Sequence, residues 1–203
     1  MRAAAKSLLA LPPYFAPQLR TTAAAFLVLT AIGFTLGTLR PETLSPMMRL
    51  FTEAAAGAGF YQVENGVLMV TILANNLLAL LLAVALGLVP FLNLPALELG
   101  VNALMIGALA AYYRDNGLGL TAYFAGTLPH GVTELTALIL ACSAGLYLCR
   151  AVSNSVLGNG SAKIVASVLS QCLRVFVRLI APLLLISAFL EAFVTPTIFG
   201  RFL

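Results

Sequence analysis

Long apolar stretches alternate with short polar segments along most of this chain. Five of the apolar stretches are 17 to 24 residues long, and the segments between them hold most of the charged residues. A helix needs about 20 apolar residues to cross the roughly 30 Å hydrocarbon core of a bilayer. The pattern therefore predicts five membrane-spanning helices, at about residues 21–39, 66–89, 96–113, 132–148 and 175–194.

A shorter apolar segment precedes the fourth predicted span. Residues 118–128 number only 11, which as a helix reach about 16 Å, or half a membrane. Pro129 and Gly131 follow directly, and both residue types interrupt helices. We therefore expect a half-membrane or re-entrant segment here, with Pro129 and Gly131 as the helix break.

The loop after the first span carries the signs of a surface helix. Ser45 and Pro46 resemble an N-cap and a first helical position, and apolar residues follow near helical spacing. A helix over about residues 46–58 would lie on the membrane surface, with Arg49 and Glu53 toward water. It would serve equally well to dock a partner.

The composition agrees with a membrane protein. Of the 203 residues, 61% are hydrophobic and 9% are charged, and the mean hydropathy is +1.02. Such a chain has too little polar surface to cover a soluble globule. We expect an all-α, polytopic transmembrane bundle in which residues 21–203 form one domain. The net charge of +4 comes from scattered basic residues that flank apolar segments, so we expect no nucleic-acid partner.

The basic residues predict an orientation. Three precede the first span, in an arm over residues 1–20, and four lie from Arg150 to Arg178. Residues 40–65 instead carry two basic and three acidic residues. Because cytoplasmic loops are enriched in lysine and arginine, we expect the arm and the 150–174 loop in the cytoplasm and the C-terminus outside. The apolar run after Lys6 is too short for a cleaved signal peptide.

A few polar side chains interrupt the apolar spans. Ionisable groups inside a membrane are costly and mark function by default. In the expected topology, His130 and Glu134 lie one helical turn apart near the level of Glu191. We expect an intramembrane polar cluster of His130, Glu134, Glu191, Asn75, Asn76 and Asn102. Such a cluster would either fix the bundle or form a functional pocket, and the residues alone leave both open.

Two glycines in the first span suggest close helix packing. Gly33 and Gly37 form a GxxxG pair, which lets another helix approach closely. We expect this pair to be a helix-pairing site and the protein to be a homo-oligomer, a dimer in the simplest case. The other expected partner is membrane lipid.

The motifs of common enzymes and metal sites are missing from the sequence. One histidine cannot supply the HExxH zinc pair, and no GxSxG nucleophile elbow occurs. The cysteines at 142, 149 and 172 have no zinc-type spacing and are read as packing residues. We therefore expect no catalytic residue, no metal and no cofactor.

Several of these polar motifs resemble the stage II sporulation protein M family. The resemblance rests on Pro-His-Gly-Val-Thr-Glu-Leu at 129–135, on Leu-Glu-Ala-Phe-Val-Thr-Pro at 190–196, and on Asn75, Asn76 and Asn102. It covers about residues 60–196. It implies a polytopic protein of the bacterial or archaeal cytoplasmic membrane. In spore formers the named member is similar in role to a scaffold that localises peptidoglycan-degrading partners, and the resemblance assigns no reaction.

The sequence is consistent with three functions. The first is a scaffold or assembly factor for a cell-envelope complex, with possible partners among peptidoglycan-remodelling proteins. The second is a small-solute or proton-coupled transporter or channel, in which the half-membrane segment forms a broken-helix site. The third is an intramembrane enzyme that uses the two glutamates as acid and base.

Overall fold

The computed structural model describes residues 15–42, 46 and 64–202, and within these residues the fold is helical with no strand. Five helices are long and apolar enough to cross a membrane. The expected surface helix at 46–58, apart from Pro46, lies outside the described residues, as does most of the arm at 1–20. The expected class, an all-α polytopic bundle with five spans, is confirmed.

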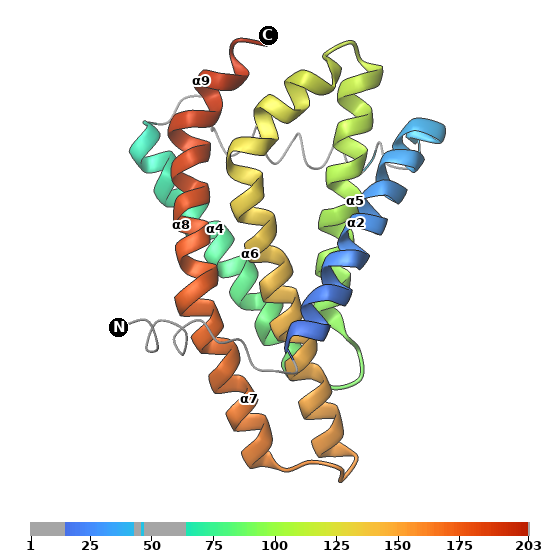
Figure 1. Cartoon of the computed structure of the whole chain (residues 1–203), viewed down its shortest axis with the longest axis vertical. Coiled ribbons are helices and arrows are strands. Elements are labelled where there is room, and N and C mark those ends of the chain that lie inside the picture. Colours follow the sequence, from blue (N-terminus) through green and yellow to red (C-terminus); the bar gives the residue numbers. More distant parts are fainter. Residues whose placement is uncertain (1–14, 43–45, 47–63, 203) are drawn as a thin grey trace.

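The five spans run up and down through one bundle (Figure 1). The first three expected spans overlap single helices, the second of which ends in a short 3-10 turn, η1. Their bounds are α2 (Phe15–Leu39), α4 (Asn65–Ala85) with η1 (Leu86–Leu88), and α5 (Leu94–Asp115). The fourth span is α6 (Gly119–Val156), and the fifth is a run of α7 (Ala162–Val175), η2 (Phe176–Ile180), α8 (Ala181–Phe189), η3 (Leu190–Val194) and α9 (Thr195–Phe199).

Helix α6 is the centre of the bundle, and α2, α4, α5, α7 and α8 all pack against it. Its middle is built from small residues, among them Ala137, Ala141 and Ala144, which are completely buried. Small side chains let helix backbones approach closely, which is how membrane helices gain packing contacts. Large apolar side chains on the outer faces, such as Leu27, Leu78 and Val177, are about two-thirds exposed and suited to lipid.

The structure corrects the expected half-membrane segment at 118–128. These residues form the first turns of α6, which continues without interruption through Pro129 and Gly131. Figure 1 shows these first turns leaning away from the rest of α6. Proline removes one backbone donor and crowds the preceding turn, which bends a helix that tertiary contacts hold together on both sides. Residues 118–128 therefore belong to the fourth of the five helices that, in the described part of the chain, are long and apolar enough to cross a membrane.

The last two spans are also longer than expected. Helix α6 extends beyond 148 to Val156, and the last run starts at Ala162 rather than 175. The expected loop at 150–174, in which the sequence already allowed a helix over 164–173, therefore shrinks to residues 157–161. Ser161 caps the new helix by accepting a hydrogen bond from the backbone N–H of Ile164 at 3.4 Å. Asn159 and Ser161 stay in this short connection, whereas Ser153, Asn154 and Ser167 lie on helices. The other face of α7 is buried through Val168 and Cys172.

Each π-helical turn in the last run stands just before a proline. The N–H of Ala181, before Pro182, bonds to the carbonyl of Phe176, and the N–H of Thr195, before Pro196, bonds to that of Leu190. Both bonds reach back five residues instead of four. A proline ring clashes with the carbonyl four residues back, and a wider turn relieves this clash. The run therefore continues to Phe199, past the end expected at residue 194.

Helices α2 and α5 approach most closely at glycines. A Cβ on Gly33 would lie 2.8 Å from the Cα of Leu104, and one on Gly37 would lie 2.9 Å from the Cβ of Ala111. From the other side, a Cβ on Gly107 would lie 2.6 Å from the backbone nitrogen of Phe34. The GxxxG pair at Gly33 and Gly37 is thus used within the chain, against α5.

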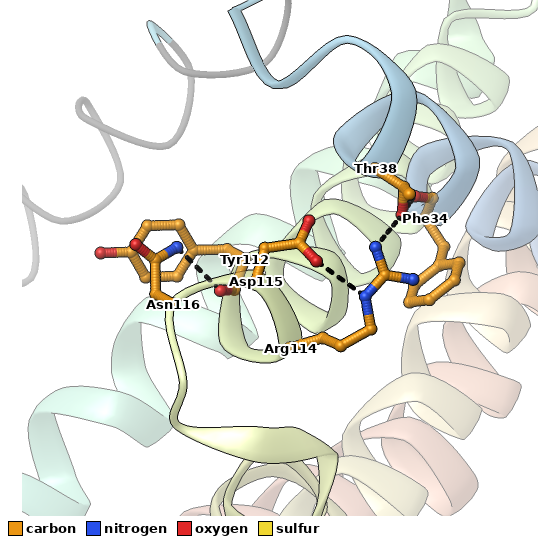
Figure 2. A network of polar contacts seen from close by, with 6 residues as sticks. All are labelled: Phe34, Thr38, Tyr112, Arg114, Asp115 and Asn116. Atoms are coloured by element: carbon orange, nitrogen blue, oxygen red, sulfur yellow. Dashed lines mark hydrogen bonds and ion pairs between the residues drawn. The ribbon is translucent and has the colours of Figure 1, made fainter.

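A polar network joins the ends of the same two helices (Figure 2). Arg114 donates from Nη2 to the Thr38 hydroxyl at 2.9 Å and from Nε to Asp115 at 2.7 Å. Its guanidinium also lies 5.0 Å from the centre of the Phe34 ring, in a cation–π contact. Asn116 caps the end of α5 by donating to the Tyr112 carbonyl at 2.9 Å. These contacts fix the register of α2 on α5.

Two neighbouring leucines of α8 give a matched test of the core. Leu184 is fully buried, whereas Leu185 is 47% exposed. Leu184→Ala is expected to lower the free energy of unfolding by about 2 kcal/mol, the lower end of the range for buried leucines, because lipid already solvates apolar surface and only packing is lost. Leu185→Ala is expected to change it by less than about 0.5 kcal/mol. Unfolding in mixed detergent micelles measures the free energy of both variants. Equal losses of stability would mean that Leu184 is packed no better than Leu185.

Candidate functional site

Three of the polar residues expected in the spans meet between α6 and the last helical run. His130 and Glu134 lie one turn apart on α6, and Glu191 lies in the π-helical turn η3. One ligand atom from each, an imidazole nitrogen or a carboxylate oxygen, lies within 4.8 Å of the other two. All three side chains are half-buried. We call these three residues the His–Glu–Glu cluster.

Side chains from two spans hold the cluster in position. His130 Nδ1 lies 3.1 Å from the hydroxyl of Thr195. The Ser187 hydroxyl lies 3.4 Å from Glu134 Oε2 and 3.3 Å from the His130 carbonyl. On the other side of the cluster, Asn76 of α4 donates to Glu134 Oε1 at 3.4 Å. The cluster is therefore anchored to α4, to the C-terminal end of α8 and to the first residue of α9.

The local sequence explains why one face of the last run carries these groups. Ser187, Glu191 and Thr195 follow one another at four-residue spacing, which aligns side chains along one side of a helix. His130 and Glu134 have the same spacing on α6. Ser187 and Thr195 were missed by the sequence reasoning, and this repeated spacing around Glu191 is the signal that points to them.

The two glutamates lack a basic partner in the described part of the chain. The ion pairs found there join Arg40 to Glu42 and Arg114 to Asp115, away from the cluster. Neither a hydrogen bond nor an ion pair joins His130 to Glu134 or Glu191 in the same residues. When ionised, carboxylates at this separation repel each other, so the site favours a positive charge placed between them.

The other expected members lie outside the His–Glu–Glu cluster. Asn75 is exposed, and among the described residues its amide donates to the neighbouring Asn76, at 3.5 Å. Asn102 donates to the backbone carbonyl of Glu98 at 2.9 Å and to its side chain at 3.1 Å, within α5. Successive residues point in different directions on a helix, so Asn75 and Asn76 cannot share a face. Asn102 sits on α5, which packs against α2 and α6 rather than α8.

The two asparagines of α4 give a matched test of the site. Asn76→Leu is expected to lower the free energy of unfolding by about 1 kcal/mol, because Glu134 loses a donor inside the bundle. Asn75→Leu replaces an exposed amide by an apolar group and is expected to leave stability unchanged or raise it. Unfolding of both variants in the same micelles compares them directly. A larger loss for Asn75→Leu would mean that α4 is rotated from the orientation described.

The fold defines a multi-pass helical membrane protein, with a polar cluster between its fourth and fifth spans. Within that class, the chain belongs to the stage II sporulation protein M family, whose model matches residues 22–196. This match confirms the resemblance carried by the motifs around His130 and Glu191. The family is not a known enzyme family. Comparison with curated proteins and with solved structures finds no match.

Proposed function

We propose that this protein is an integral membrane scaffold or assembly factor for a cell-envelope complex. The observation that carries the proposal is the family match, which extends over residues 22–196 and so overlaps all five spans. The proposed partners are peptidoglycan-remodelling proteins, as the family resemblance implies. The basic residues of the arm and of the region 150–178 support a cytoplasmic N-terminus and an external C-terminus in a bacterial or archaeal cytoplasmic membrane.

The packing of the bundle supports a role in holding partners. The spans pack through small residues on their inner faces, while the outer faces carry many large exposed apolar side chains. These outer faces are the surfaces that lipid and other membrane proteins can contact. Because Gly33 and Gly37 already contact α5, a homodimer would form through other residues.

Affinity purification from native membranes tests the scaffold. The full-length tagged chain is crosslinked in living cells, and peptidoglycan-degrading enzymes are quantified in the eluate against a tagged, unrelated five-span protein. We expect enrichment with the wild type, retained in Glu98→Gln, whose carboxylate bonds Asn102 away from the cluster. Glu134→Gln is expected to reduce it, because Glu134 links α6 to α4 and α8. Equal recovery with the unrelated protein would contradict the proposal.

A transporter or channel is the second candidate, and the half-buried His–Glu–Glu cluster favours it. Ionisable groups within a span are typical of ion and proton pathways. Proton flux into liposomes that contain the purified protein separates the two candidates. A flux that Glu191→Gln abolishes in a folded protein would replace the scaffold by a transporter. Wild-type flux no higher than that of empty liposomes would leave the scaffold as the better account.

A further inference from the structure

We propose that His130, Glu134 and Glu191 form a binding site for a divalent transition-metal ion such as Zn²⁺. The proposal rests on the geometry of these residues and is independent of the scaffold role. The sequence predicted no metal site because the three ligands do not form a local motif. Two lie on α6 and the third lies 57 residues after Glu134, in η3.

The distances suit three ligands around one ion. A nitrogen and two oxygens bound to tetrahedral zinc at about 2.0–2.2 Å lie about 3.4 Å from one another. The corresponding atoms here all lie within 4.8 Å, and they are not hydrogen-bonded to one another in the described part of the chain. They therefore surround a common point instead of neutralising each other. An ion at that point would bring them to bonding distance through small side-chain rotations.

The neighbours of the cluster have the arrangement found around metal ligands. A metal-bound histidine commonly bonds a second group through its other ring nitrogen, which fixes the ring. Here Thr195 bonds Nδ1 at 3.1 Å, which leaves Nε2 for the metal. Glu134 is held in the same way, by Asn76 at one oxygen and Ser187 at the other. These hydrogen bonds are independent of the ligand distances and point to the same use.

The charge and the donor types define the kind of ion. Two carboxylates without a basic partner in the described residues would be balanced by a doubly charged cation. The imidazole nitrogen favours zinc and its transition-metal neighbours over magnesium and calcium, which prefer oxygen ligands. Three protein ligands leave a fourth tetrahedral position for water or another molecule. All three side chains are partly exposed, so none is sealed inside the protein.

Metal titration of the full-length protein tests the site. The protein is purified in detergent, stripped with a chelator and titrated with Zn²⁺ against a fluorescent competitor. We expect one equivalent bound by the wild type, and affinity at least 100-fold lower in His130→Ala and Glu191→Gln. Thr195→Val keeps every ligand but loses the bond to the ring, so a roughly tenfold loss is expected. Glu98→Gln is the control, because its carboxylate bonds Asn102 instead, and its affinity should equal that of the wild type.

Cobalt supplies a readout that does not depend on affinity. Co²⁺ in a tetrahedral site of nitrogen and oxygen ligands absorbs visible light strongly, and we expect this spectrum from the wild type and Glu98→Gln but not from Glu191→Gln. A thermal transition measured without metal confirms that each variant is folded. The proposal is overturned if the wild type binds Zn²⁺ no more tightly than folded Glu191→Gln, or if both give the same cobalt spectrum.

Discussion

Replacing Gly107 by alanine is expected to lower the free energy of unfolding by about 3 kcal/mol, the upper end of the usual cost of overpacking. The added Cβ would lie 2.6 Å from the backbone nitrogen of Phe34 and would also clash with the Thr30 carbonyl oxygen. Both atoms belong to the backbone of α2, so a side-chain rotation cannot relieve the contact. The two helices would have to separate, which would also pull Thr38 away from Arg114. Unfolding in mixed micelles measures the loss.

Gly66 provides the control for this prediction. It lies in the first turn of α4, and a Cβ there would meet nothing within 4 Å. Gly66→Ala is expected to raise stability slightly, by up to about 1 kcal/mol, because alanine favours the helix more than glycine does. The two substitutions therefore add the same methyl group with opposite effects. A Gly107→Ala protein as stable as the wild type would show that α2 does not pack on α5 at this position.

Zinc is expected to stabilise the protein through the His–Glu–Glu cluster. At a free concentration one hundred times the dissociation constant, binding raises the free energy of unfolding by about 2.7 kcal/mol. Without metal we expect the opposite order. Glu191→Gln removes the cost of holding two carboxylates within 4.8 Å of each other, so this variant is expected to be at least as stable as the wild type. The wild type should thus be the less stable protein in chelator and the more stable one in zinc.

Thermal unfolding with and without Zn²⁺ measures this crossover, with Glu98→Gln as the control. Glu98 keeps its own partner, Asn102, and does not belong to the cluster, so its variant should respond to zinc as the wild type does. An equal zinc response in Glu191→Gln and the wild type would show that the ion binds elsewhere. Each variant is compared with itself, with and without Zn²⁺. A general effect of the substitution on folding is present in both conditions and therefore cancels.

The fold could be predicted from the sequence largely because the bilayer sets the length of its helices. The apolar stretches at 21–39, 66–89 and 96–113 overlap α2, α4 with η1, and α5. The structure differs from the prediction around Pro129 and at the end of the last span, because proline usually ends a helix and here it does not. In this bundle contacts from α4 and the last run hold α6 on both sides of Pro129, and a wider turn accommodates Pro196.

The candidate site could be predicted only in part. A sequence shows where a polar residue lies along a helix, but it shows less surely which side of the helix that residue faces. His130, Glu134 and Glu191 stand out because ionisable groups are rare in apolar spans, and the structure brings them together. Asn75 and Asn102 stand out for the same reason, yet they point to lipid or to their own helix. Which asparagine faced Glu134 depended on the rotation of α4, which the uniformly apolar sequence around it does not specify.

A double-mutant cycle between Glu134 and Glu191 tests the central claim, that acids from separate spans share one polar site. Each is changed to glutamine alone and together, and unfolding free energies are measured in chelator. Groups in direct contact give coupling energies of about 0.5–3 kcal/mol, and we expect a value in this range. The pair Glu98 and Glu134 should be additive within about 0.5 kcal/mol. Additivity between Glu134 and Glu191 as well would contradict the account, because it would mean that the two carboxylates do not meet.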